Sequence, residues 1–348
     1  MTSRSLNDLI YDTLASVPWQ TKLQPTLPME EVHVVLHEPA ILGGYRVPHK
    51  PWKYYFFSLF QLHNETVNVW SHIIGCVVIL YKLYHFFDEF DLGRDHVLTT
   101  LLLFGISCLI GLGTSAAVHL LHAKSPYIHF VAFMVDYIGA TFCSFGSGIA
   151  ALYGYSKAET YDSIKDFYAP LVFISSYLNF LNLCLAKIWY GHDPHNLNRK
   201  YMFIFGMGIQ AFINMAPWIP RFVDCFHDNT CSFSSLNHIS IIPFVFVLEA
   251  VAFAAHQPEK TFPGKCDIVG QGHQLFHVLI VLNHVFQLDA IYIDHKNNLT
   301  GHSEPDFWFY LIMMIVLYVI EAASLCIIAR LVPASIKKAE EADEEKRK

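Results

Sequence analysis

Long apolar segments dominate this sequence. Two of them, "VWSHIIGCVVILYKLYHFF" at residues 69–87 and "VLTTLLLFGISCLIGLGTSAAVHLL" at residues 97–121, are close to the roughly 20 residues that a helix needs to span a bilayer. Only 15% of the residues are charged, whereas a soluble domain carries about 25%. Further candidate spans lie at about residues 130–154, 168–190, 201–219, 238–256, 271–293 and 306–332. We therefore predict an all-α membrane protein with eight spans.

The two ends of the chain are polar. The first residues, "MTSRSLNDLIYDTLASVPWQTKLQ", lack the continuous apolar core of a signal peptide, so the first span should begin near Val69. Within this arm, "LNDLIYDTLASV" could form a short amphipathic helix on the membrane. We expect an N-terminal arm and juxtamembrane segment at 1–68, a transmembrane domain with the functional site at 69–332 and a charged tail at 333–348. The net charge of −7, without a basic cluster inside the chain, argues against nucleic acid as a partner.

The distribution of basic residues predicts the orientation. With eight spans and an inner N-terminus, most of the 23 Lys and Arg residues fall in inner segments, chiefly the two tails, as the positive-inside rule requires. Both tails are therefore expected in the cytoplasm. The plasma membrane is the expected location, although no sorting signal separates it from internal membranes.

The cysteines divide into two groups. Cys225 and Cys231 in "DCFHDNTC" lie in a predicted outer loop, where a disulfide is permitted. The other six cysteines lie in or near spans and are interpreted as small apolar residues. A glycosylation triplet at Asn298 also falls in a predicted outer loop.

Two histidines open the seventh span. His273 and His277 in "GQGHQLFH" are one helical turn apart and project from the same face, so that two imidazoles could bind one metal ion. Histidines at a helix start that bond to neighbours or to water would give the same pattern. The pair alone therefore leaves both interpretations open.

Residues of two other spans favour a metal. Ser115 and His119 share a face near the end of the second span, and Asp136 lies in the first turns of the third. The predicted topology places all of them in the cytoplasmic half with the seventh-span pair, at comparable depth given about 1.5 Å of rise per residue. Ionisable groups inside a span usually face a partner or a cavity, and three imidazoles with one open position are typical of zinc. We expect zinc on His119 and the later pair.

Neighbouring residues could assist such a site. His122, one turn after His119, is a rival for the third ligand position. Asp136 could accept a proton from a water at the site, and Ser115 could orient that water.

A polar patch leads into the first span. Glu65, Asn68 and His72 of "HNETVNVWSH" lie within two turns on a common face. An acidic residue near the positive end of a helix explains Glu65 on its own, but Asn68 and His72 continue the face inward, which favours a network that supports the metal. Other polar residues in the spans are expected to form interhelical hydrogen bonds, with one or two available to a ketone or hydroxyl of a ligand: Gln210, Asn214, Glu249, Gln287, Asp289 and Glu321.

Three segments resemble a known family. They are "GYRVPHKPWKYYFFSLFQLHNETVNVWSH" at residues 44–72, "SAAVH" with "FMVDY" in the second and third spans, and "PEKTFPGKCDIVGQGHQLFH" at residues 258–277. Together they resemble the progestin and adipoQ receptor family, most closely its membrane progestin receptor branch, over about residues 39–332. The resemblance implies a core of seven spans like that of the adiponectin receptors, a cytoplasmic N-terminus and an eighth span at about 306–332.

The resemblance also implies roles for individual residues. The zinc-binding histidines of the family fall on His119, His273 and His277, and its conserved serine and aspartate fall on Ser115 and Asp136. Its leading Glu, Asn and His correspond to Glu65, Asn68 and His72. This sequence departs at Ser71, where threonine is usual, and at His122, where glutamine is common; the second departure keeps the alternative ligand open.

Two functions are compatible with these residues. The resemblance implies a receptor whose progestin-like steroid enters an apolar pocket from the bilayer and whose conformation is read by a G protein or another cytoplasmic transducer, with zinc in a structural role. The alternative is a zinc-dependent hydrolase of a sphingolipid-like amide such as ceramide, with Asp136 as general base and Ser115 beside it. A transporter or channel is disfavoured because the expected ligands gather at one depth. We favour the receptor.

Overall fold

The computed structural model describes residues 24–90, 97–191, 196–299 and 305–348, and these residues form a bundle of long helices without a strand. The expected all-α membrane fold is thereby confirmed. The predicted amphipathic helix at residues 6–17 lies outside the described residues. The helices of nine residues or more are α3 (Thr66–Glu89), α4 (Val97–Leu121), α5 (Pro126–Gly154), α6 (Ala158–Tyr190), α7 (Leu197–Met215), α8 (Ile219–His227), α9 (Asn237–Ala255), α10 (Gly272–Lys296), α11 (Phe307–Ile328) and α12 (Val332–Arg347). Shorter elements are α2 (Trp52–Phe57), η2 (Met29–Glu31), η3 (Val34–Leu36), η4 (Ser58–Phe60), η5 (His122–Lys124), η6 (Phe233–Leu236) and η7 (Ala329–Leu331).

Seven helical segments in the described ranges are long and apolar enough to cross a membrane, and a bent pair of helices makes an eighth if the pair is counted as one span. The candidate span predicted at 201–219 is bent in the structure. Helix α7 ends at Met215, and α8 begins at Ile219 with a bend of 59° between them. Pro217 and Pro220 explain the break, because proline lacks the backbone N–H and disfavours helical geometry in the residue before it.

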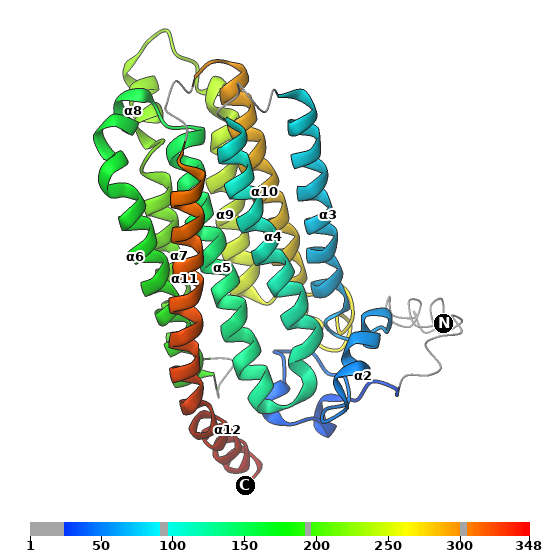
Figure 1. Ribbon diagram of the computed structural model, residues 1–348. Helices are drawn as coiled ribbons and strands as arrows, with labels where there is room; N and C mark the ends of the chain where they lie inside the picture. Colours follow the sequence, from blue (N-terminus) through cyan, green and yellow to red (C-terminus); the bar gives the residue numbers. More distant parts are fainter. Residues whose placement is uncertain (1–23, 91–96, 192–195, 300–304) are drawn as a thin grey trace, which may run out of the picture.

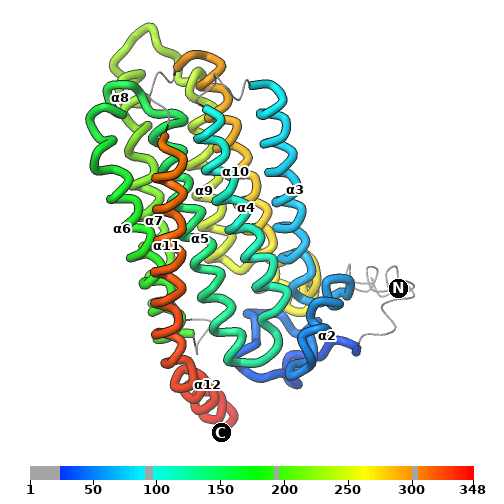
Figure 2. The backbone as a smooth tube through the Cα atoms, viewed as in Figure 1, coloured from blue at the N-terminus to red at the C-terminus, as the bar shows by residue number. Residues whose placement is uncertain are grey.

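The described ends of the chain lie at the same end of the bundle. Figures 1 and 2 show the segment that follows residue 24 and helix α12 at this end, which we call the arm end, with α8 at the opposite or far end. Eight crossings, with the bent pair counted as one span, require this arrangement. Helix α11 fills the eighth position predicted for it: Met314 and Leu317 are fully buried in a cluster with residues of α5 and α6. Helix α12 covers most of the tail predicted at 333–348.

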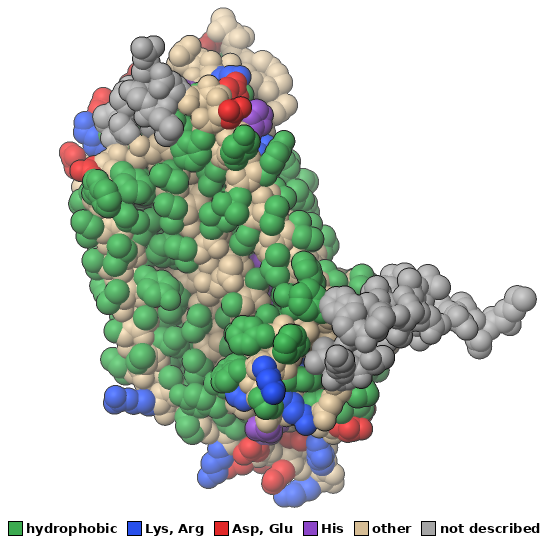
Figure 3. Space-filling view, turned by 45° about the vertical axis from the view of Figure 1, so that its right-hand side comes forward, with side chains coloured by type: hydrophobic (Ala, Val, Ile, Leu, Met, Phe, Trp, Pro, Cys, Tyr) green, Lys and Arg blue, Asp and Glu red, His purple; other side chains and the backbone are tan. Residues whose placement is uncertain are grey.

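The flank of the bundle is apolar. In Figure 3 green side chains cover the visible flank, and charged side chains gather toward the two ends. Large aromatic side chains such as Tyr84, Phe205 and Trp308 are about two-thirds exposed. Exposed apolar surface on this scale is unfavourable in water and is expected of a surface that faces lipid. The surface therefore agrees with the membrane assignment.

Small residues bring α4 close to α5. A Cβ atom at Gly139 would lie 3.3 Å from the Cα atom of Gly111, so both positions favour the absence of a side chain. Close approach through small residues is a usual way to pack helices in a membrane. It places Ser115 of α4 and Asp136 of α5 along one wall.

The arm packs against the end of the bundle. Arg46 is 2% exposed, and its guanidinium donates to the carbonyl oxygens of His119, at 2.7 Å, and Leu120. These are carbonyls of the last turn of α4, which lack partners within the helix. The arm thereby anchors the helix end that carries His119.

The far end is joined by polar contacts. Asp294 of α10 is fully buried; it pairs with Arg221 of α8 and accepts from His238 of α9, the latter at 2.7 Å. Cys225 and Cys231 form the disulfide that their predicted location permits. The second residue of the Asn298 triplet is described, but Thr300 lies outside the described residues.

Candidate metal centre

Three imidazoles converge near the arm end. His119 lies in the last turn of α4, and His273 and His277 lie in the first turns of α10. Their donor atoms are all within 4.8 Å of one another, and the Nε2 atoms of His273 and His277 are 3.2 Å apart. The structure therefore brings together the three histidines that the sequence analysis selected.

The predicted supporting residues lie directly behind these rings. Oε2 of Glu65 is 2.7 Å from Nδ1 of His119, and the backbone carbonyl of Asn68 is 3.2 Å from Nδ1 of His277. His72 stacks on His277 with ring centroids 3.9 Å apart. The Asn68 amide also donates to Glu65, at 2.6 Å. All three predicted residues contact the histidines or one another.

The donor set fits zinc. In metal sites the second ring nitrogen of a ligating histidine commonly bonds to a carboxylate or a backbone carbonyl, as Nδ1 does here in His119 and His277. The Nε2 atom of His119 is buried without a hydrogen-bond partner, and the Nε2 atoms of His273 and His277 adjoin it. Three imidazoles with an open fourth position suit tetrahedral zinc.

The segment at residues 258–277, the last of the three that resemble the family, contains the start of α10. Oε1 of Gln274 accepts from the backbone N–H groups of Gly270 and Gln271, at 2.8 and 3.3 Å. The Gln271 amide donates to the carbonyl of Asn64, at 3.0 Å, and so joins α10 to the arm. A Cβ atom on Gly272 would lie 2.8 Å from the carbonyl oxygen of Gln257. The glycine therefore lets the preceding loop approach the helix that carries His273.

Asp136 and Ser115 stand beside the three imidazoles. Both residues line the same internal cavity as the three histidines, and the Ser115 hydroxyl interacts with the Asp136 carboxyl. Asp136 does not belong to the group of donors that lie within 4.8 Å of one another. Its position suits proton transfer in the cavity rather than direct ligation.

His122 faces another set of partners. Its Nδ1 atom is 3.1 Å from Nδ1 of His129, and its Nε2 atom is 3.5 Å from Oε1 of Glu65. The group of potential donors that contains His122 consists of Glu65, His119 and His122. His122 is therefore separated from the α10 pair by His119 and Glu65, and the geometry favours His119 over its rival.

A cavity of about 460 Å³ extends through the bundle from the three imidazoles. Its walls include apolar residues such as Phe246, Phe253 and Ile280, and amide side chains such as Gln210 and Asn214. The volume lies within the range of about 300–1,000 Å³ that is usual for small-ligand sites. The cavity can therefore hold a compact apolar molecule with a few polar groups.

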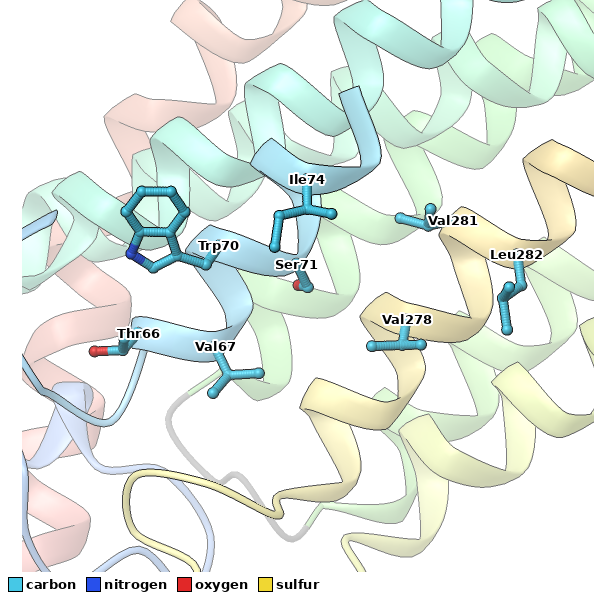
Figure 4. Close-up of a pocket in the computed structure, with 8 residues that line it drawn as sticks. All are labelled: Thr66, Val67, Trp70, Ser71, Ile74, Val278, Val281 and Leu282. Carbon is cyan, nitrogen blue, oxygen red and sulfur yellow. The ribbon is translucent and has the colours of Figure 1, made fainter. Parts of the chain in front are cut away.

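A groove of about 380 Å³ lies outside the metal centre, between α3 and α10. Figure 4 shows its lining: Thr66, Val67, Trp70, Ser71 and Ile74 from α3, and Val278, Val281 and Leu282 from α10. Ser71 directly precedes His72 in the chain, and Val278 directly follows His277. The groove therefore lies on the bundle surface at the level of the histidines.

Most other polar residues in the spans join helices, as predicted. Glu249 accepts from Asn283, Glu321 from Thr141, Asp289 from Lys82 and Gln287 from Ser147.

The sequence analysis did not assign a role to Arg46, which anchors the carbonyls of α4. The place of Arg46 in the "GYR" segment was the sequence signal that it has a role. That segment does not indicate which helix the side chain contacts.

Comparison with known proteins identifies the family. Residues 60–288 match the family described as haemolysin-III related. The chain belongs to this family. Similar proteins include "Membrane progestin receptor alpha-B" of Danio rerio, which is 31% identical over 288 residues that cover 82% of this chain and 81% of the relative. "Membrane progestin receptor beta" of Homo sapiens is 34% identical, covering 84% of this chain and 81% of the relative. "Membrane progestin receptor alpha" of Homo sapiens is 33% identical, covering 80% of each chain.

Membership confirms the resemblance to the progestin and adipoQ receptor family on its membrane progestin receptor branch. Together with the apolar helices, it makes this haemolysin-III related chain a multi-pass membrane protein. The family match spans α3 to most of α10 and so contains every residue of the candidate metal centre.

Proposed function

We propose that this protein is a membrane receptor for a progestin-like steroid, with a zinc ion bound by His119, His273 and His277. The observation that carries this proposal is the internal cavity, which joins apolar walls, amide side chains and the three imidazoles in one space. The names of the relatives as membrane progestin receptors support the choice of ligand.

Gln210 is the proposed contact for a polar group of the steroid. Its side chain is 2% exposed and lines the cavity. Its Nε2 donates to Asn214 at 3.2 Å, while its Oε1 has no hydrogen-bond partner. A buried acceptor without a partner costs about 1–3 kcal/mol. A ligand hydroxyl that donates to this oxygen would remove the cost, and the second amide proton could bond to a ketone.

The groove between α3 and α10 is the proposed entrance from the bilayer. Its lining is apolar apart from Thr66 and Ser71, which suits a steroid that partitions into lipid. Because Ser71 and Val278 adjoin His72 and His277 in the chain, a small separation of α3 from α10 would connect the groove to the cavity.

Zinc has a structural role in this proposal. When bound, it would join α4 to α10 and could polarise a carbonyl group or water in the cavity. Glu65 would hold the ring of His119, and the Asn68 carbonyl the ring of His277, so that both Nε2 atoms face the ion. Steroid in the cavity would then act on helices that are already tied together at the arm end.

The proposed orientation places the arm end in the cytoplasm, in accordance with the positive-inside rule. We propose the plasma membrane as the location and a G protein or another cytoplasmic transducer as the partner that contacts the arm end and α12. The domain limits at residues 68 and 332 remain part of this proposal.

A lipid amide hydrolase is the second candidate, and the position of Asp136 favours it. The carboxyl lines the cavity beside Ser115 and could accept a proton during cleavage of a ceramide-like amide. Ser115 would hold the carboxylate and the reacting water in place.

One experiment separates the two functions. The full-length protein in nanodiscs is assayed for saturable progesterone binding and for release of fatty acid from ceramide, as wild type and as Asp136→Ala. Binding in both proteins without fatty-acid release supports the receptor. Release that disappears in Asp136→Ala, without steroid binding, supports the hydrolase and contradicts the receptor.

The steroid site has its own test. Gln210→Ala should weaken progesterone binding roughly tenfold, because it removes a polar contact of about 1–3 kcal/mol. Asn182→Ala is the matched control: its amide bonds to the carbonyl of Met202, at 2.8 Å, and it does not line the cavity. Equal affinities of the two variants would contradict the assigned contact.

A further inference from the structure

A second group of metal-binding side chains lies deeper in the same bundle. Cys108 of α4, Cys143 of α5 and His284 of α10 present donor atoms that are all within 4.8 Å of one another. His284 follows His277 by two helical turns, which correspond to about 10 Å along α10. The group is therefore a separate site from the three imidazoles, although α4 and α10 contribute to both.

The two cysteines are buried, and the internal cavity reaches the group. Cys108 is fully buried and Cys143 is 8% exposed, while Cys143 and His284 both line the internal cavity. The cavity provides a path to a sulfur and an imidazole from the metal centre near the arm end. A site without such a path could be filled only during folding.

One ring nitrogen of this group lacks a partner. Nδ1 of His284 is buried without a hydrogen bond, and the loss of hydration of such a nitrogen costs about 1–3 kcal/mol. A bound cation would compensate this cost. The unpartnered nitrogen and the clustering of the donors are both compatible with a bound cation.

The packing of α4 makes room for the sulfur of Cys143. A Cβ atom on Gly111 would lie 2.6 Å from Sγ of Cys143, so a larger residue there would displace the thiol. Sγ of Cys143 also lies 3.1 Å from the carbonyl oxygen of Ser107, the residue before Cys108. The Cys143 thiol of α5 therefore packs directly against α4, next to Cys108.

We propose that Cys108, Cys143 and His284 bind a thiophilic divalent cation, with zinc as the reference ion. Thiolate and imidazole ligands select zinc over magnesium or calcium, which prefer oxygen. Three protein ligands leave one position of a tetrahedron open toward the cavity. This proposal does not depend on the function of the cavity or on the three-imidazole site.

The balance of charge favours a divalent ion. Two thiols lose two protons on binding, so that two thiolates, a neutral imidazole and one divalent cation have no net charge. A monovalent cation with two thiolates would leave a negative charge within the bundle, where uncompensated charge is costly. The deprotonation that would be unfavourable for either thiol alone is compensated by the ion.

Cobalt is the probe for this site. Full-length protein is stripped of metal and titrated with Co²⁺, and the thiolate-to-cobalt charge-transfer band is measured in the near ultraviolet. An imidazole-only site has no such band. We expect the band in the wild type and its loss in Cys143→Ser. His284→Gln should bind the ion at least about tenfold more weakly, because even residues that only support a ligand change affinity by about 10–100-fold.

The controls separate this site from the first one. His119→Ala should lose the three-imidazole site and keep the thiolate band. Cys184→Ser should also keep it, since Cys184 is a buried free cysteine outside the group. In the wild type alone, zinc should displace cobalt and abolish the band, which tests the proposal even if a variant fails to fold. A cobalt-saturated wild type without a thiolate band, or a band that survives in Cys143→Ser, would overturn it.

Discussion

The Nδ1 atom of His119 lies 2.7 Å from Oε2 of Glu65, a residue 54 positions earlier in the sequence. This contact fixes the ring so that its Nε2 atom, which has no partner, lies beside His273 and His277. Glu65 itself is held by Asn68, at 2.6 Å. Glu65, at the start of α3, therefore determines which ring nitrogen of His119 is available to an ion.

Removal of the charge of Glu65 should weaken zinc binding. Glu65→Gln keeps the shape of the side chain but replaces a carboxylate with an amide, so it orients His119 less firmly and makes the ring a poorer donor. We expect zinc affinity to fall by about 10–100-fold, as measured by competition with a chelator. Glu321→Gln is the control, because this buried carboxyl of α11 bonds to Thr141, outside the site. If both variants bind zinc like the wild type, Glu65 does not support the ion.

The contact between α3 and α10 should depend on Gly75. A Cβ atom there would lie 2.6 Å from Cγ2 of Val281, so Gly75→Ala should destabilise the protein by about 1–3 kcal/mol through overpacking. Gly113 has nothing within 4 Å of its Cβ position, and Gly113→Ala should stabilise α4 by about 0.5–1 kcal/mol. Thermal unfolding of both variants in nanodiscs measures the contrast. Similar effects of the two substitutions would contradict the close packing of α3 on α10.

The buried pair at the far end should contribute more than an exposed one. Asp294→Asn leaves the guanidinium of Arg221 without its carboxylate partner, and breaking a buried pair costs about 3–5 kcal/mol. Asp224→Asn is the matched change in a solvent-exposed pair with Lys157, for which about 0–1 kcal/mol is expected. Unfolding by heat or denaturant compares the two losses. A small effect of Asp294→Asn would show that the pair does not hold α8 against α10.

The arm should make stability depend on pH. Burial raises the pKa of the Glu38 carboxyl from 4.5 to about 7, with a further contribution from Glu65. Since the folded-state pKa is the higher one, this group stabilises the fold fully below pH 4.5, and the contribution is lost as the pH rises through about 7. Glu38→Gln should flatten the fall in melting temperature over this range.

Glu31→Gln, which changes an exposed carboxyl of the same arm, is the control for the pH experiment. It should retain the wild-type dependence on pH. If Glu38→Gln and the wild type lose stability in parallel, the Glu38 carboxyl does not titrate in the way that its burial indicates.

The sequence predicted the bundle and the convergence of the histidines because both follow from the bilayer. Apolar length defined the spans, and the alternation of direction placed the end of the second span beside the start of the seventh. The same reasoning brought Glu65, Asn68 and His72 to that level. Hydropathy does not register a bend inside an apolar window. The break between Met215 and Ile219 was therefore missed, although Pro217 and Pro220 were its signal.

Other features depend on how each helix is rotated about its axis, which apolar composition does not encode. Cys108 and Cys143 look like small apolar residues in their own segments, and only the packing of α4 against α5 and α10 brings them to His284. The contact of Arg46 with the carbonyls of α4 similarly requires knowledge of where the arm folds back. Local sequence patterns do not identify the partners of these residues.

Metal content of purified protein tests the central claim most directly. Cys143→Ser is used as the background, so that only the three-imidazole site is counted, and His119→Ala, His273→Ala and His122→Ala are compared in it. We predict that zinc copurifies with the background protein, is lost from the His119 and His273 variants, and is retained by the His122 variant. Zinc retained without His119 but lost without His122, or no zinc in the background protein, would contradict the account.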